Sequence, residues 1–228
     1  MIVFDQVSHE FRLGTTHFAA LRDVSLSLSE QRIGVIGANG SGKSTFVRMI
    51  NGLIKPTAGR VTVDGLDTDR DGKAVRRRVG FCFTDPDAQI LMPTVAEDLA
   101  FGLRGRGLSR DEVTDKVESA LAAYDLLGYR DHPASLLSGG QKQLLALASV
   151  LIIEPSVLVL DEPATLLDLA NTQRVQRLIA QLPQQVVLVT HHFGLIEDFD
   201  RVLVFDTGRV VYDGAPQAAV AHYVGLVR

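Results

Sequence analysis

The stretch that decides the fold is an aliphatic run at residues 32–36 followed by Gly37, Ala38, Asn39, Gly40, Ser41, Gly42, Lys43, Ser44 and Thr45. The spacing Gly-x4-Gly-Lys-Ser is that of a phosphate-binding loop, which stands between a buried strand and a helix. Glycines let backbone N–H groups turn toward phosphate oxygens, and the helix N-terminus adds partial positive charge. The loop therefore predicts a nucleotide site, with Lys43 on the β- and γ-phosphates and the Ser44 hydroxyl on Mg²⁺.

Two carboxylates follow a second aliphatic run, at residues 157–160. Asp161 and Glu162 directly follow this run, at the strand edge where open α/β sheets bind ligands. One carboxylate can hold Mg²⁺ and the next can face an attacking water. A strand that merely ends in two solvated acids would have the same sequence pattern. We favour the functional interpretation because the phosphate loop is also present.

Composition limits the function classes. The 228 residues are 46% hydrophobic and 22% charged, which is typical of a globular chain. The 23 basic and 27 acidic residues give a net charge of −4, so nothing general favours nucleic acid or an anionic bilayer. Cys82 is the single cysteine, which excludes an intrachain disulfide. The start lacks a signal-peptide pattern, and the longest apolar run, 144–153, is about half of the ~20 residues of a membrane span. We expect a cytosolic chain that does not cross the membrane.

Hydrophobic patterning predicts an α/β fold with a mostly parallel sheet and an N-terminal antiparallel β layer. Aliphatic runs indicate parallel strands buried on both faces, whereas alternating segments indicate half-exposed strands. The aliphatic runs are residues 32–36, 157–160 and 186–189, the alternating segments are 2–4, 24–28 and 60–64, and a hairpin is expected at 202–212. We predict one domain, 1–228.

The segment from about residue 86 to residue 153 is expected to be a helical subdomain inserted in the α/β core. It holds a capping box, Ser109 with Glu112, followed by apolar residues at helical spacing. A further helix is expected to begin at Asp168 and to be closed by Pro183.

The ordered motifs resemble those of the ATP-binding cassette (ABC) ATPases, which are P-loop NTPases. The resemblance covers essentially the whole chain and rests on the phosphate loop, on Asp161-Glu162 and, between them, on Leu137, Ser138, Gly139, Gly140 and Gln141. It implies that two cassettes, expected to be identical, close head-to-tail, each ATP lying between one phosphate loop and the other copy's signature. The start of the signature helix would then point at the γ-phosphate across the interface. A serine cap and glycine turn before a core helix is the plainer alternative.

The resemblance also implies roles for single residues. Asp161 would position Mg²⁺, Glu162 would polarise the hydrolytic water and His191 would sense the γ-phosphate, with Lys43 as the third catalytic residue. Asp168 resembles the aspartate that communicates across the dimer, although it could simply cap its helix.

The base site is less clearly marked. Phe11 is the candidate for stacking on adenine, with Phe18 as the alternative, and both could equally belong to the core.

One position departs from the family pattern. The family usually has Gln after the aromatic residue of the strand at 79–83, and here Thr84 stands there. The Thr84 hydroxyl is our candidate for reaching Mg²⁺ or its water, with a shorter arm. Gln89 is the alternative for that role, or a contact to a membrane partner.

Residues 85–89 and 93–102 resemble the energy-coupling-factor (ECF) importers, and the chain is most similar to their biotin-transport ATPases. This implies a transmembrane coupling protein and a substrate-binding membrane subunit as partners, ATP and Mg²⁺ as cofactors, and a place at the cytoplasmic face of the cell membrane. Cobalt or nickel import is the near rival. A soluble ABC ATPase acting on nucleic acid or ribosomes would carry a long insertion or fused cassettes, and a non-hydrolysing regulator is disfavoured by Glu162 and His191.

Overall fold

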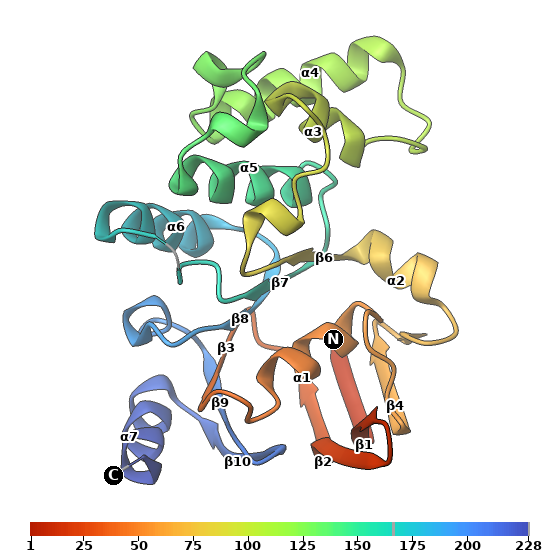
Figure 1. Cartoon of the computed structure of the whole chain (residues 1–228), viewed down its shortest axis with the longest axis vertical. Coiled ribbons are helices and arrows are strands. Elements are labelled where there is room, and N and C mark those ends of the chain that lie inside the picture. Colours follow the sequence, from red (N-terminus) through yellow and green to blue (C-terminus); the bar gives the residue numbers. More distant parts are fainter. Residues whose placement is uncertain (166, 228) are drawn as a thin grey trace.

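The computed structural model describes residues 1–165 and 167–227, and its strands form two sheets (Figure 1). The antiparallel sheet contains, in spatial order, β2 (Thr16–Leu28), β1 (Ile2–Leu13), β4 (Ala58–Val63) and β5 (Leu66–Asp67). The larger sheet contains β10 (Arg209–Gly214), β9 (Arg201–Asp206), β3 (Arg32–Gly37), β8 (Gln185–Val189), β7 (Val157–Asp161) and β6 (Val79–Cys82). The predicted α/β fold with an antiparallel layer is confirmed.

The aliphatic runs occupy the centre of the larger sheet. Strands β9, β3, β8, β7 and β6 are mutually parallel, and β10 closes the edge as the antiparallel partner of β9. All residues of β6 and β7 are buried, which is why these strands read as continuous apolar sequence. The predicted hairpin is confirmed as β9 and β10.

The antiparallel layer is longer than the sequence pattern indicates. Strands β1 and β2 form a long hairpin, of which only the ends at 2–4 and 24–28 were predicted. Register shifts follow Phe4, Val7 and His9 along β1, and each shift interrupts the period-two alternation on which the prediction depends.

Helices cover both faces of the larger sheet and extend beyond it. They are α1 (Lys43–Ile50), α2 (Gly72–Arg78), α3 (Val95–Gly102), α4 (Arg110–Ala123), α5 (Gly139–Leu151), α6 (Leu169–Gln181) and α7 (Pro216–Leu226), with short 3₁₀ turns η1 (Pro86–Ala88), η2 (Leu127–Tyr129), η3 (Ala134–Leu136) and η4 (Phe193–Leu195). Figure 1 shows α3, α4 and α5 together at one end of the molecule. The segment 86–153 is thus helical, as predicted.

Helix α5 joins this end to the rest. Its residues Ala146 and Leu147 are buried in the cluster under the larger sheet, whereas Leu145 and Ala148 are buried in a second cluster with α3 and α4. The helix therefore belongs to two cores and links α3 and α4 to the larger sheet.

The predicted helix starts are confirmed. Ser109 and Glu112 form the capping box of α4, and the Asp168 side chain accepts from the Asn171 N–H at the start of α6. Helices α2 and α7 were not predicted. Within residues 1–165 and 167–227, no helix combines the length and the hydropathy needed to span a bilayer.

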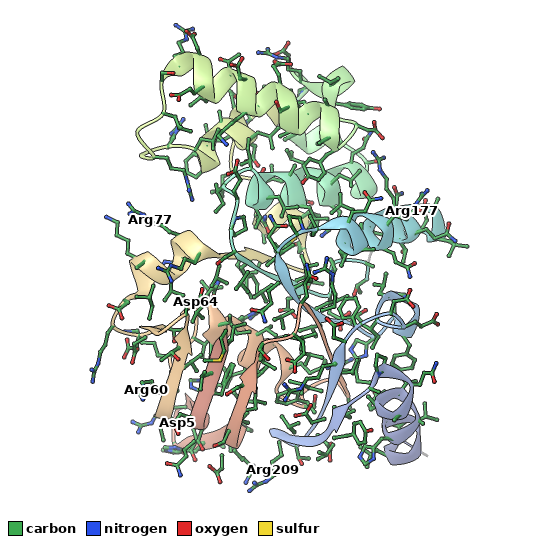
Figure 2. All side chains as sticks on the ribbon, turned by 180° about the vertical axis from the view of Figure 1, so that it is seen from behind. Asp5, Arg60, Asp64, Arg77, Arg177 and Arg209 are labelled. Carbon is green, nitrogen blue, oxygen red and sulfur yellow. The ribbon has the colours of Figure 1, made fainter. Side chains whose placement is uncertain are left out.

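Charged side chains are spread over the surface. In Figure 2 the labelled arginines come from four separate elements, namely β4, α2, α6 and β10 (Arg60, Arg77, Arg177 and Arg209). Asp5 lies 3.8 Å from Arg60 across β1 and β4, an exposed pair of small energetic weight.

Candidate functional site

The predicted site residues gather where four neighbouring strands end. The phosphate loop follows β3, His191 follows β8, Asp161 ends β7 with Glu162 next, and Thr84 follows β6. Because these strands are parallel and adjacent, their carboxyl ends lie at one edge. This is the edge at which open α/β sheets bind ligands.

The phosphate loop packs tightly against neighbouring backbone. Gly37 has φ of 147°, and a Cβ there would collide with the Phe205 carbonyl oxygen. Gly42 has φ of 106°, and a Cβ there would collide with the Ala20 carbonyl oxygen. Both glycines are therefore required by space as well as by backbone conformation.

Lys43 spans the loop that precedes it. Its Nζ donates to the carbonyl oxygens of Gly37 at 2.8 Å and of Ala38 at 2.9 Å, and the residue is buried. Burial lowers the pKa of Lys43, while the carboxylates of Glu162 and Asp161 oppose that shift. An ammonium has three donors, so one remains for a ligand oxygen.

Asp161 is a buried carboxylate held from α1. The Ser44 Oγ donates to its Oδ1 at 3.0 Å, and the Arg48 Nη2 lies 3.2 Å from its Oδ2. Only 1% of the Asp161 side chain is exposed. Sequence reasoning missed Arg48, although its spacing of four residues from Ser44 places both on one helix face.

Hydroxyl and carboxylate oxygens such as those of Ser44 and Asp161 are ligands that Mg²⁺ prefers, and Mg²⁺ commonly takes few protein ligands and completes its shell with phosphates and water. The described part of the chain holds no cluster of three or more His, Cys, Asp or Glu side chains fit for a metal. The residues present therefore fit Mg²⁺ bound together with a nucleotide.

Glu162 and His191 face each other beside the loop. The His191 Nε2 lies 3.1 Å from Glu162 Oε1 and 3.1 Å from Asn39 Oδ1, and the His191 N–H donates to Glu162 Oε2 at 3.3 Å. Glu162 has φ of 58°, outside the region most residues adopt. Its Oε1 is buried and has no well-aligned hydrogen bond among the described residues. The site thus offers a carboxylate beside the phosphate loop, with its Oε1 against the His191 ring.

A cavity of about 460 Å³ opens above these groups. Its lining comes from the β1–β2 hairpin, the phosphate loop and the two strand ends, and consists of Phe11, Phe18, Ala19, Ala20, Asn39, Gly40, Gly42, Lys43, Ser44, Thr45, Glu162 and His191. Phe11 and Phe18 are directly opposite in the hairpin and are 44% and 54% exposed. Neither ring is a core residue, and both are placed where a base could stack.

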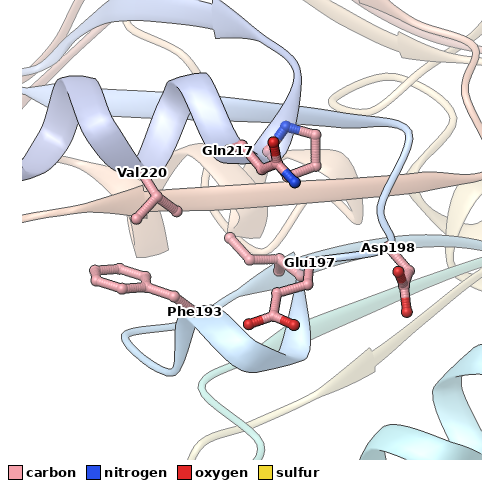
Figure 3. A pocket seen from close by; sticks show the side chains of 7 residues that line it. Phe193, Glu197, Asp198, Gln217 and Val220 are labelled. Carbon is pink, nitrogen blue, oxygen red and sulfur yellow. The ribbon is translucent and has the colours of Figure 1, made fainter.

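A second cavity, of about 550 Å³, lies between η4 and α7 (Figure 3). Phe193 and Val220 give it an apolar side, while Glu197 and Asp198 place two carboxylates on its rim. The described residues that line this second cavity include no cationic side chain, whereas Lys43 lines the cavity at the phosphate loop, which is therefore the one suited to a nucleotide.

The signature residues lie outside the lining of the nucleotide cavity. Ser138 caps α5, with a reciprocal capping box through Gln141, and Gly139 and Gly140 form its first turn. A Cβ on Gly140 would collide with the Asn171 side chain on α6, whereas one on Gly139 would meet open space. Asp168 accepts from the Asn171 N–H at 2.8 Å and so caps α6. The starts of α5 and α6 are thus adjacent, and the side of α5 at Gly139 is open.

Thr84 and Gln89 both bond to backbone. The Thr84 Oγ1 donates to the Asp161 carbonyl oxygen at 2.7 Å. The Gln89 Oε1 accepts from the Phe83 N–H at 3.1 Å, and its Nε2 donates to the Ala146 carbonyl oxygen at 2.8 Å on α5. Both hydrogen-bonding ends of the Gln89 amide are therefore occupied, and metal contact by Thr84 or Gln89 stays a prediction.

Comparison with known proteins agrees with this geometry. Residues 21–165, more than half of the chain, match the family model described as ABC transporter. A putative ABC transporter ATP-binding protein of Deinococcus radiodurans is 52% identical over 98% of this chain and 97% of its own length. The biotin transport ATP-binding protein BioM of Rhizobium etli is 50% identical over 90% of this chain and 91% of its own length. The cobalt import ATP-binding protein CbiO of Syntrophus aciditrophicus is 43% identical over 89% of this chain and 75% of its own length.

Solved structures share the fold. CbiO1 of Clostridium perfringens, part of the ABC transporter complex CbiONQ, superposes with a TM-score of 0.83 at 30% identity, covering 98% of this chain and 92% of that chain. The cassette MJ0796 was solved as a dimer in a post-hydrolysis state with ADP and phosphate. It superposes with a TM-score of 0.84 at 29% identity, covering 95% of this chain and 99% of that chain. The predicted ABC fold is confirmed, and the chain belongs to the ABC transporter family as an ATPase that couples ATP hydrolysis to transport.

Proposed function

We propose that the chain is the ATP-hydrolysing subunit of an ECF-type importer and that it works as a head-to-tail homodimer. The observation that carries the catalytic part is the pairing of Glu162 with His191 beside the phosphate loop, with Glu162 Oε1 3.1 Å from His191 Nε2. A relative of similar length is named a biotin transport ATP-binding protein, which supports the transport assignment.

The phosphate loop binds the triphosphate in this proposal. Backbone N–H groups at the start of α1 and the Lys43 ammonium stabilise the negative charge of the phosphates. Phe11 stacks on the base at the far end of the cavity, which fixes the direction of the nucleotide. Ser44 and Asp161 hold Mg²⁺, which supplies further positive charge to the β- and γ-phosphates.

Glu162 orients and deprotonates the attacking water. Its Oε1 lies 3.1 Å from the His191 Nε2, while its Oε2 accepts from the Thr165 hydroxyl at 3.1 Å and from the His191 N–H, which keeps the side chain in place. The His191 ring is partly exposed and the residue lines the cavity, so in this proposal the ring bonds to a γ-phosphate oxygen. Positioning and electrostatic stabilisation supply most of the rate increase in this chemistry.

A second copy completes the site. Ser138 to Gln141 lie outside the lining of this chain's own nucleotide cavity, although a helix start with free N–H groups suits a γ-phosphate. The dimeric form of the MJ0796 cassette supports closure by two copies. Asp168, beside α5 through Asn171, would pass the state of one site to the other.

The membrane partners follow from the relatives. CbiO1 is part of a CbiONQ complex, which supports a transmembrane coupling protein and a substrate-binding membrane subunit for this chain, at the cytoplasmic face of the membrane. Biotin is the substrate we favour because BioM is 50% identical; cobalt import is the alternative because a relative at 43% identity is named for it, and nickel stays with it as a further metal cargo.

Uptake measurements test this assignment. Cells lacking the chain should lose ATP-dependent uptake of radiolabelled biotin, and the affinity-tagged chain should co-purify from membranes with two membrane subunits. Loss of cobalt or nickel uptake with normal biotin uptake would favour the alternative, and normal uptake of all three would contradict the importer role.

A further inference from the structure

Asp161 poses an electrostatic problem that the nucleotide site must solve. Its carboxylate is 99% buried, since only 1% of the side chain is exposed. A buried charge destabilises the fold unless it is compensated by an opposite charge and by hydrogen bonds. Ser44 supplies a hydrogen bond to Oδ1, and Arg48 supplies the one ion pair recorded for Asp161 in the described part of the chain.

Helix α1 brings both partners to the carboxylate. Ser44 and Arg48 are four residues apart and so lie on one face of the helix, one turn from each other. The Arg48 Nη2 lies 3.2 Å from Asp161 Oδ2, whereas its Nε is buried without a partner among the described residues. Contact with Asp161, rather than a network of bonds, therefore holds this end of the arginine.

We propose that Arg48 is the resident counter-charge of Asp161 and a positioning residue that sets the affinity of the site for Mg²⁺. The inference rests on the proposed function, in which Ser44 and Asp161 hold the metal. Before the metal binds, Arg48 compensates the carboxylate and fixes its Oδ2. After it binds, the guanidinium is a second positive charge on the same carboxylate and opposes the metal.

The two effects have opposite signs, which separates this role from a merely structural one. Removing the charge of Arg48 leaves Asp161 without its ion pair. Only the Ser44 hydrogen bond and the charge of Lys43 then compensate the carboxylate, so the metal-free protein loses stability. The same change removes a repulsion that acts over a few ångströms in a partly buried site, so Mg²⁺ binds more tightly. A residue that only supported the fold would, when removed, weaken both the protein and its metal site.

The test compares Arg48→Gln with Arg174→Gln. Arg174 is a matched control because it is similarly exposed, 35% against 40%, and pairs with Asp125 at 2.6 Å away from the nucleotide cavity. Melting in EDTA gives the metal-free stability, and calorimetric titration of Mg²⁺ into the ADP-bound protein gives the metal affinity. We expect Arg48→Gln to melt several degrees lower in EDTA and to bind Mg²⁺ about fivefold more tightly, with Arg174→Gln unchanged in Mg²⁺ affinity.

Arg48→Lys keeps the charge without the planar fork, and it should bind Mg²⁺ within about twofold of the wild type. Weaker or unchanged Mg²⁺ binding in Arg48→Gln would overturn the inference. Equal changes of Mg²⁺ affinity in Arg48→Gln and Arg48→Lys would also overturn it. If Arg48→Gln does not fold, the Mg²⁺ affinity of Arg48→Lys decides: an affinity equal to that of the wild type supports the role of the charge, and a different affinity opposes it. If the wild type itself binds no Mg²⁺ with ADP, the proposed function fails first, so the two failures are distinguishable.

Discussion

The imidazole of His191 and the carboxylate of Glu162 meet over the phosphate loop, with Nε2 3.1 Å from Oε1. The two residues follow the ends of adjacent parallel strands, β8 and β7, and the Glu162 N–H donates to the Val189 carbonyl oxygen at 3.0 Å. Backbone pairing of the strands therefore sets the distance between the two side chains. The register of β7 and β8 thus brings the two side chains together just beyond the strand ends.

Glu162→Gln should stop hydrolysis while ATP still binds. The amide has nearly the shape of the carboxylate but cannot take a proton from water. ATP should then hold two copies together, and light scattering should show a dimer with ATP and a monomer with ADP. The neighbouring change Thr165→Ala, which removes only one hydrogen bond to Oε2, serves as the control and should lower the rate far less.

An ATP-loaded Glu162→Gln protein that stays monomeric at every concentration would count against closure by two copies. A variant that hydrolyses ATP at the wild-type rate would remove Glu162 from the chemistry.

Lys43→Ala should lower the rate of ATP hydrolysis by about 100-fold or more, because a positioned donor to the phosphates is lost. Steady-state phosphate release by the assembled transporter is the measurement. Lys116→Ala is the matched control, since that lysine pairs with Glu154 on the surface, and it should leave the rate unchanged. Normal turnover in Lys43→Ala would show that the phosphate site is elsewhere.

Phe11→Ala should raise the KM for ATP about tenfold and leave kcat nearly unchanged, because base stacking contributes about 1–3 kcal/mol to binding. Phe11→Tyr keeps an aromatic face and should behave like the wild type. Phe18→Ala is the informative comparison, since Phe18 stands directly opposite in the hairpin and is similarly exposed. A larger effect from Phe18→Ala would transfer the stacking role to Phe18.

Cys82 predicts a pH dependence of stability. Burial raises the pKa of the Cys82 thiol to about 12, against about 8.5 in an unfolded chain. The protonated Cys82 thiol therefore contributes fully to the free energy of unfolding below pH 8.5. This contribution is lost as pH rises toward 12, because the thiol ionises first in the unfolded chain. Urea unfolding of the wild type and of Cys82→Ala should show their free-energy difference falling by about 1 kcal/mol between pH 7.5 and pH 9.5. A constant difference would mean that the folded thiol ionises as easily as the unfolded one.

Much of the fold could be predicted because local patterns and tertiary structure agree. The runs that end at Ile36, Leu160 and Val189 are buried on both faces of the sheet. Strands buried in this way have continuous aliphatic sequence, which is why they could be predicted. The caps of α4, α5 and α6 were predictable for a similar reason, since Ser109, Ser138 and Asp168 satisfy N–H groups only a few residues away.

The remaining features depend on contacts between distant residues. The shifts of register in β1 arise from pairing with β2 and β4, which period-two alternation cannot show. The contact of Arg48 with Asp161 joins residues 113 positions apart. The bond from Thr84 to the Asp161 carbonyl oxygen requires β6 beside β7, so the sequence alone left the task of Thr84 open.

The central claim is that the signature of one copy closes on the phosphate loop of the other, and disulfide trapping tests it most directly. In a Cys82→Ala, Glu162→Gln background, cysteines would be placed at Asn39, which lines the nucleotide cavity, and at Gly139, where a side chain meets open space. A cross-linked dimer should form rapidly with ATP and far more slowly without nucleotide. Equal cross-linking with and without ATP, or none with ATP, would contradict it.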